Sequence, residues 1–221
     1  MKKAIVIAHR GFHRDFPENT IEAFKAALDL GADGVEFDVQ ETADGQFVIH
    51  HDDDIGGRGI GSLALAEIAV CRVSGGYRIP TLREALEVLG RGLVLLVELK
   101  QVRSLEKFLS LLRRHVDAAF KVLVSFDAAL IEKLALLAPD FPRAVIGEPA
   151  GAGHTAVAAG FTQVQANIVT GDLVKEAHDR GGLVFVRDGG EEEDLRRALR
   201  CGIDIIMTDR PDVVIREIRV L

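Results

Sequence analysis

Short apolar runs alternate with helix-like segments along most of this sequence, and that alternation restricts its fold more than any other feature. Residues 4–8 are all apolar, as is typical of a strand buried on both faces of a parallel sheet. Further strands are predicted at residues 34–39, 93–99, 122–126, 144–146, 162–166, 183–186 and 203–207. Helices are predicted between a cap at Asn19 or Thr20 and Gly31, and at residues 81–89, 104–115, 128–137, 155–159 (weakly), 172–180, 191–200 and 212–220. About eight strand–helix units result, which is the number that forms a TIM (β/α)8 barrel.

The second unit carries an extra strand. Ala43-Asp44-Gly45 is a turn signal, and residues 46–50 are predicted to return antiparallel to the strand before them. This hairpin would fold His51 back toward Glu36 and Asp38.

The stretch from 52 to 80 is irregular and rich in glycine, with one short helix predicted at 63–70. We interpret it as a short insertion or lid after the hairpin, inside a single TIM-barrel domain that spans residues 1–221. A doubly wound open sheet is the alternative fold, but it would normally carry a glycine-rich phosphate loop after its first strand. Gly11-Phe12-His13 is not such a loop.

Net charge, cysteine spacing and the length of the first apolar run each argue against particular classes of protein. The net charge is −7, which argues against general nucleic-acid binding because that requires a basic surface. Cys71 and Cys201 have no metal-ligand spacing and are interpreted as free thiols of a reducing compartment, with a disulfide between them as the alternative. The apolar run at residues 4–8 is too short for a secretory signal or a membrane span, so we expect a cytoplasmic protein without stable membrane insertion.

Ionisable residues gather at the ends of the first three predicted strands. Glu36 and Asp38 share one face of their strand because side chains alternate with period two, and Glu98 and Lys100 do the same on the next strand. Three carboxylates in one place repel each other unless a cation neutralises them, and Mg²⁺ or Ca²⁺ suits oxygen ligands better than zinc does. The alternative is ion pairing with Arg10 and Lys100 and no metal.

Two histidines stand beside these carboxylates. His9 and His51 both lie at strand ends, as expected for a general base and a general acid. Arg10 would bind phosphate oxygens through its planar guanidinium, while Lys100 and the metal would stabilise charge on them. The residues alone therefore predict metal-assisted cleavage of a phosphodiester. Histidines assigned to structural or surface roles are His13, His115, His154 and His178, and His50 is expected to point away from the site.

The motifs resemble those of a known family. They are His9-Arg10-Gly11, Pro17-Glu18-Asn19-Thr20, Ala23-Phe24, Gly31-Ala32-Asp33, Glu36-x-Asp38-Val39, Thr42-x-Asp44-Gly45, His51-Asp52, Ile79-Pro80-Thr81-Leu82, Glu98-Leu99-Lys100, Ser125-Phe126 and Thr208-Asp209-Arg210-Pro211. Together they cover nearly the whole chain and resemble the signature of the glycerophosphodiester phosphodiesterases.

This resemblance implies a TIM-barrel hydrolase that releases glycerol 3-phosphate and an alcohol from small glycerophosphodiesters. It implies His9 and His51 as the acid–base pair and one Mg²⁺ or Ca²⁺ on Glu36, Asp38 and Glu98. It also implies phosphate contacts from Arg10 and Lys100. A substrate hydroxyl would attack first, and water would then open the cyclic phosphate. Glu18-Asn19 would support the site from the start of the first helix, or would simply cap that helix.

One motif departs from the family. Where the family usually has Trp-Thr-Val-Asn, this chain has Arg187-Asp188-Gly189-Gly190. The missing tryptophan removes a wall near the organic part of the substrate. Arg187 would either contact an anionic headgroup or pair with Asp188. The segment 53–61 is also shorter and richer in glycine than the family's run after His-Asp.

Two other functions compete with this reading. A related phospholipase, of the lysophospholipase D or sphingomyelinase type, should show an apolar rim or an interfacial helix near the site, and no strongly amphipathic basic stretch is found. A non-catalytic phosphate sensor should lack a histidine or a metal carboxylate, yet all are present. We expect no nucleic-acid partner and either a monomer or a homodimer.

Overall fold

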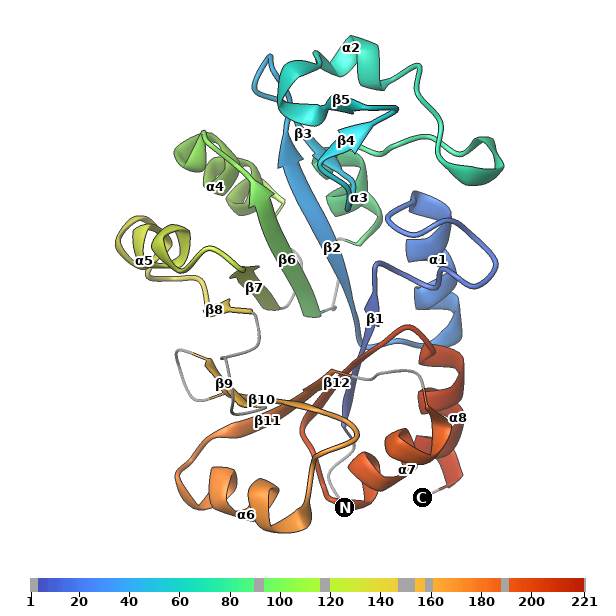
Figure 1. The fold of residues 1–221 in the computed structure, drawn as a ribbon, viewed down its shortest axis with the longest axis vertical. Coiled ribbons are helices and arrows are strands. Elements are labelled where there is room, and N and C mark those ends of the chain that lie inside the picture. Colours follow the sequence, from blue (N-terminus) through green and yellow to red (C-terminus); the bar gives the residue numbers. More distant parts are fainter. Residues whose placement is uncertain are drawn as a thin grey trace.

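The computed structural model describes residues 4–89, 94–115, 120–146, 154–157, 161–187 and 191–220. Eight parallel strands lie side by side in one curled sheet, in the order β8-β7-β6-β2-β1-β12-β11-β10 (Figure 1). They are β1 (Ile5–His9), β2 (Gly34–Glu41), β6 (Val94–Gln101), β7 (Phe120–Ser125), β8 (Arg143–Val145), β10 (Phe161–Gln165), β11 (Leu183–Arg187) and β12 (Ile205–Thr208). This arrangement confirms the predicted TIM-barrel fold class. Among the described residues, no hydrogen-bonded strand pair closes the ring beyond β8.

Helices follow the parallel strands other than β8 along the chain and cover the outer face of the sheet (Figure 1). They are α1 (Ile21–Leu30), α3 (Leu82–Val88), α4 (Leu105–Arg114), α5 (Ala128–Leu137), α6 (Gly171–Asp179), α7 (Glu192–Arg200) and α8 (Pro211–Val220). The first shows the local causes clearly. Thr20 caps α1 by accepting a hydrogen bond from the Ala23 amide, and Gly31 ends it with φ 91°, a left-handed conformation that glycine adopts without strain. None of the described helices is long and apolar enough to cross a bilayer.

The helix predicted weakly at 155–159 is wrong. The chain forms β9 (His154–Val157) there, antiparallel to β10, while residues 158–160 lie outside the described residues. Thr155 and Val157 are β-branched, and pairing with β10 gives the backbone a ladder of hydrogen bonds that a weak helix would lack. The fifth unit of the barrel thus carries a strand where a helix was expected.

The predicted hairpin is confirmed. β3 (Phe47–Ile49) runs antiparallel to β2, with Val39 opposite Ile49. The segment 52–80 follows it and contains a two-strand ribbon, β4 (Asp54–Ile55) with β5 (Arg58–Gly59), and two short 3₁₀ turns. Its helix, α2 (Leu65–Ile68), is shorter than the prediction at 63–70.

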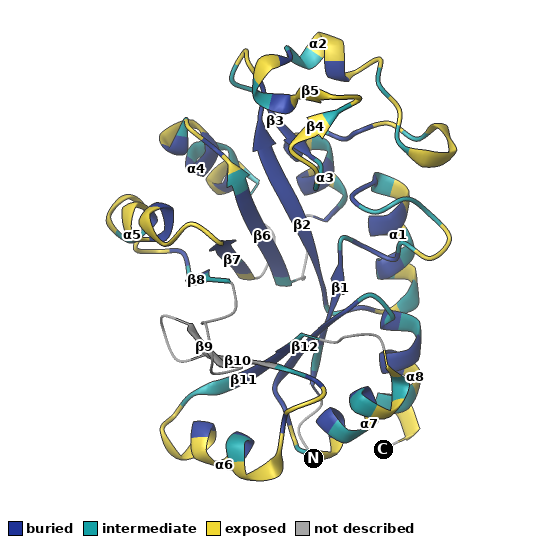
Figure 2. Cartoon of the chain, viewed as in Figure 1, coloured by how far each residue is buried: buried dark blue, intermediate teal, exposed yellow. Residues whose placement is uncertain are grey.

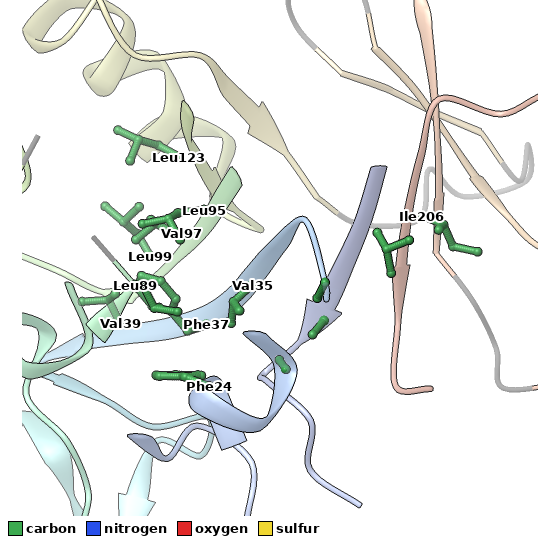
Figure 3. Packing of buried hydrophobic residues seen from close by; sticks show 14 of the residues in the cluster. Phe24, Val35, Phe37, Val39, Leu89, Leu95, Val97, Leu99, Leu123 and Ile206 are labelled. Carbon is green, nitrogen blue, oxygen red and sulfur yellow. The ribbon is translucent and has the colours of Figure 1, made fainter. Parts of the chain in front are cut away.

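The largest core cluster lies between the sheet and its helices. Figure 3 shows Phe24 of α1 against Phe37 of β2, whose rings are 5.9 Å apart, with Val35 and Val39 beside them. Because strand side chains alternate, the other face of β2 points into the barrel. All of β2 is buried, as Figure 2 shows, so the polar residues on that inner face are shielded from solvent.

Candidate active site

Three carboxylates converge inside the barrel. Glu36 and Asp38 come from β2 and Glu98 from neighbouring β6, where Asp38 and Glu98 stand opposite each other in register. All three are buried, and one oxygen of each lies within 4.8 Å of the others. Burial, together with the charges of Asp38 and Glu98, raises the pKa of Glu36 well above its ordinary value. Burial and Asp38 also raise the pKa of Glu98.

Two of these oxygens have no hydrogen-bond partner. Glu36 Oε1 and Asp38 Oδ1 are buried and accept no hydrogen bond, an arrangement that costs free energy. Lys100 Nζ lies 3.5 Å from both Asp38 Oδ1 and Glu98 Oε1, so the ion pairing predicted as the alternative to a metal is present as well. An all-oxygen set with orphaned atoms fits a hard divalent cation such as Mg²⁺ or Ca²⁺.

Arg10 and its neighbours hold these carboxylates in place. The Arg10 amide donates to Glu36 Oε2 at 3.1 Å, and its guanidinium bonds both Glu18 oxygens at 2.9 and 3.0 Å. Its Nε lies 3.3 Å from Asp38 Oδ2. Arg10 has φ 54°, a conformation uncommon for a residue with a side chain and often found at functional sites. The turn continues through Gly11, where a Cβ would come within 2.7 Å of the Ala23 backbone.

Asn19 proves to be more than a helix cap. Thr20 performs the capping, whereas Asn19 Nδ2 donates to Asp38 Oδ2 at 2.7 Å. Asn19 is buried and also has a positive φ of 58°. The Glu18-Asn19 pair therefore contacts the site from the β1–α1 connection, through Arg10 and Asp38 respectively.

His9 lies between the carboxylates and the last strand. Its Nδ1 is 2.5 Å from Asp209 Oδ1, and its Nε2 is 3.8 Å from Glu36 Oε2 and 3.4 Å from Arg187 Nη2. Burial is the main cause that lowers the pKa of His9, aided by the charge of Arg187 and opposed by the bond to Asp209. The neutral imidazole is thus favoured.

The sequence places Asp209 at the end of the final strand but does not identify it as the partner of His9. His13, assigned to a structural or surface role, also contacts Asp209, with its Nε2 3.2 Å from Oδ1. Partial burial acts to raise the pKa of Asp209, but the hydrogen bonds from His13 and His9 bring it well below its usual range. These three residues form a second cluster beside the carboxylates.

His51 follows β3 near the end of β2, where the His50 amide donates to the Asp38 carbonyl at 3.0 Å. Its Nδ1 is 2.9 Å from Asp52 Oδ1, and its side chain is about a third exposed (35%). No hydrogen bond or ion pair joins His51 to Glu36, Asp38 or Glu98, all of which the structure describes. The hairpin therefore brings His51 to the rim of the site and not into its buried floor.

The sequence and structure match known proteins over nearly their full lengths. The model of the glycerophosphoryl diester phosphodiesterase family matches residues 9–213. This chain belongs to that family. A glycerophosphodiester phosphodiesterase of Caldanaerobacter subterraneus subsp. tengcongensis is 31% identical, with 98% of each chain covered. One from Bacillus altitudinis is 29% identical, covering 96% of this chain and 98% of the other. The crystal structure of one from Agrobacterium tumefaciens has a TM-score of 0.86 at 26% identity and covers 96% of this chain and 99% of that one.

As a glycerophosphodiester phosphodiesterase, the chain is an enzyme that hydrolyses phosphoric diesters. Arg187, where it departs from the family's usual tryptophan, ends β11 with its guanidinium beside His9. Asp188, its predicted alternative partner, lies outside the described residues, as do Gly189 and Gly190. Arg187 is half-buried and thus reaches the site through its contact with the buried His9.

Proposed function

We propose that this phosphodiesterase converts small glycerophosphodiesters to glycerol 3-phosphate and an alcohol, using one divalent cation held by Glu36, Asp38 and Glu98. The observation that carries the proposal is His9 Nε2, which lies 3.8 Å from an oxygen of this buried carboxylate cluster. A proton-transferring group thus stands beside a cation site, as metal-assisted phosphodiester cleavage requires. The names of the relatives support the substrate class. A cytoplasmic location and a monomer or homodimer remain predictions from the sequence.

His9 is proposed as the general base and His51 as the general acid. Each has Nδ1 bonded to an aspartate, Asp209 and Asp52 respectively, so Nε2 is the nitrogen that would face the substrate. Nε2 of His9 lies 3.4 Å from Arg187 Nη2, so the substrate hydroxyl would take the place of this contact. Nε2 of His9 takes the proton of the attacking hydroxyl as the new P–O bond forms. His51 gives a proton to the leaving alcohol oxygen as the old bond breaks. Where a substrate hydroxyl attacks first, water opens the cyclic phosphate with the two roles exchanged.

Cationic side chains are proposed to bind the phosphate. Arg10 and Lys100 already face carboxylates, so they would neutralise the phosphate together with the cluster and not as isolated charges. Arg187 would add a direct contact to a phosphate oxygen beside Nε2 of His9. The cation, when bound, would polarise the phosphoryl oxygens and stabilise their developing charge.

Asp209→Asn is expected to lower kcat by about 10²- to 10⁴-fold while KM and metal affinity change little, because the amide no longer fixes the His9 tautomer. Steady-state kinetics and calorimetric metal titration would measure this. Asp212→Asn is the matched control, since Asp212 lies three residues on and pairs with Arg210. Equal kcat values for Asp209→Asn and the wild type would rule out this role.

Arg187→Met is expected to weaken inhibition by inorganic phosphate about 10-fold, because a charge-assisted bond to the anion is lost. Inhibition constants measured at fixed metal concentration would test it, with Arg196→Met as the control. Arg196 pairs with Glu217 on the outside of the barrel. Unchanged phosphate inhibition in Arg187→Met would contradict the phosphate contact and favour the alternative role of Arg187, pairing with Asp188.

The proposed function is tested by product analysis. Glycerophosphocholine, glycerophosphoethanolamine and a lysophospholipid would be incubated with the enzyme and Mg²⁺, Ca²⁺, Mn²⁺ or EDTA. We expect metal-dependent release of glycerol 3-phosphate from the two soluble diesters. Hydrolysis of the lysophospholipid alone would instead support the phospholipase reading.

A further inference from the structure

Gln40 is a fully buried polar residue (0% exposed) that continues the row of Glu36 and Asp38 along the inner face of β2. The functions assigned above leave it without a role. Its position follows from period-two alternation, which places every second residue of the strand on the same face.

The Gln40 amide binds the backbone around His51. Its Nε2 lies 2.9 Å from the His50 carbonyl oxygen, 3.5 Å from that of His51 and 2.6 Å from that of Asp52. Only a donor suits three carbonyl oxygens, so this orientation of the amide is chemically required. In this orientation Gln40 Oε1 is buried without a hydrogen-bond partner, which costs free energy. An apolar residue would avoid that cost but would leave these three carbonyl oxygens without their donor, so the role of Gln40 lies in holding this stretch of backbone.

These contacts lie on both sides of His51 in the chain. Asp52, whose carbonyl is held by Gln40, bonds Nδ1 of His51 through its carboxylate. The buried amide of Gln40, on the strand that carries Glu36 and Asp38, thus fixes the backbone on both sides of His51. It also fixes Asp52, which orients the His51 ring. The imidazole itself is partly exposed, and Asp52 is its one side-chain hydrogen-bond partner among the residues that the structure describes.

We propose that Gln40 is the positioning residue of His51, tying the rim histidine to the strand that carries Glu36 and Asp38. This rests on the proposed role of His51 as the general acid. A misplacement of a catalytic group by about 1 Å can cost on the order of 100-fold in rate. The adjacent Glu41 offers a matched comparison, because it points to the other side of β2. It anchors a different loop by accepting bonds from the Arg103 amide, the Ser104 amide and the Ser104 hydroxyl at 2.6, 2.8 and 2.7 Å.

The test is a double-mutant cycle with metal-loaded enzyme and glycerophosphodiester substrate. Gln40→Met keeps the size of the side chain and removes its donors. We expect kcat to fall about 10- to 100-fold with KM and calorimetric metal affinity nearly unchanged. In the His51→Ala background the same substitution should change kcat less than about twofold, because the group that it positions is already gone. Glu41→Met should lower Tm but leave kcat of the folded protein within about twofold.

An equal loss of kcat from Gln40→Met in both backgrounds would overturn the inference, as would a wild-type kcat in Gln40→Met. If His51→Ala alone keeps full activity, His51 is not the general acid. That result is distinguishable from one that contradicts only the positioning role of Gln40. If Gln40→Met does not fold, the double-mutant cycle is repeated with Gln40→Asn. Its shorter side chain keeps the amide but cannot reach the three carbonyl oxygens.

Discussion

His9→Ala is expected to lower kcat by about 10³-fold, because proton transfer by a positioned side chain contributes roughly 10²- to 10⁴-fold. Nε2 of His9 lies 3.8 Å from Glu36 Oε2 of the carboxylate cluster, and Asp209 bonds its other nitrogen. Metal affinity should change little, since His9 is not among the proposed ligands. Steady-state kinetics together with calorimetric metal titration would separate the two effects.

His115→Ala provides the control for this experiment, because His115 follows α4 and takes no part in the proposed chemistry. Its kcat should stay within about twofold of the wild type. If the His9→Ala enzyme keeps more than a tenth of wild-type kcat, a group other than His9 is the general base. A loss of metal binding in the same variant would instead make His9 a ligand.

Glu36→Gln is expected to abolish metal-dependent turnover and yet to stabilise the metal-free protein. Burial and the charges of Asp38 and Glu98 raise the pKa of Glu36, so the folded state disfavours its ionised form. The stability that protonated Glu36 contributes is fully present below the ordinary pKa of 4.5 and is lost as the pH rises through the higher pKa of the folded state. A neutral amide removes this penalty. Gains of about 1–3 kcal/mol are typical when an unsatisfied buried group is relieved, or about 2–4 °C in Tm per kcal/mol.

Thermal unfolding in EDTA at pH 5 and at pH 7.5 would measure this effect, and the gain in Tm should be larger at pH 7.5. Glu87→Gln is the control, because Glu87 is an exposed carboxylate on α3. If the Tm of Glu36→Gln in EDTA falls below that of the wild type, the carboxylate cluster is a stabilising ion-pair network. The ion pairs of Arg10 and Lys100 would then explain it without a metal.

The carboxylate cluster was predictable because its spacing is local. Glu36 and Asp38 share a face by alternation, and a single strand-to-strand step aligns Asp38 with Glu98. The fold class was predictable for the same reason, since the apolar runs and caps repeat at short range. The hairpin that carries His51 follows from one turn signal.

The missed contacts depend on long-range pairing. Asp209 reaches His9 only because β12 pairs with β1 and joins the two ends of the chain. His13 joins them from the β1–α1 connection, whose left-handed residues no periodicity reveals. For Gln40, the period-two row indicated the face but not the backbone carbonyls that its amide meets. β9 formed where weak helical periodicity was outweighed by pairing with β10.

The most direct test of the account is a titration of Mg²⁺ or Ca²⁺ into EDTA-treated, dialysed enzyme. Metal occupancy by calorimetry and release of glycerol 3-phosphate would be followed on the same samples. We predict one binding site, activity that rises in proportion to its occupancy, and neither signal in Glu36→Gln. Full turnover by the metal-free enzyme, or metal binding that Glu36→Gln leaves intact, would contradict the proposed site.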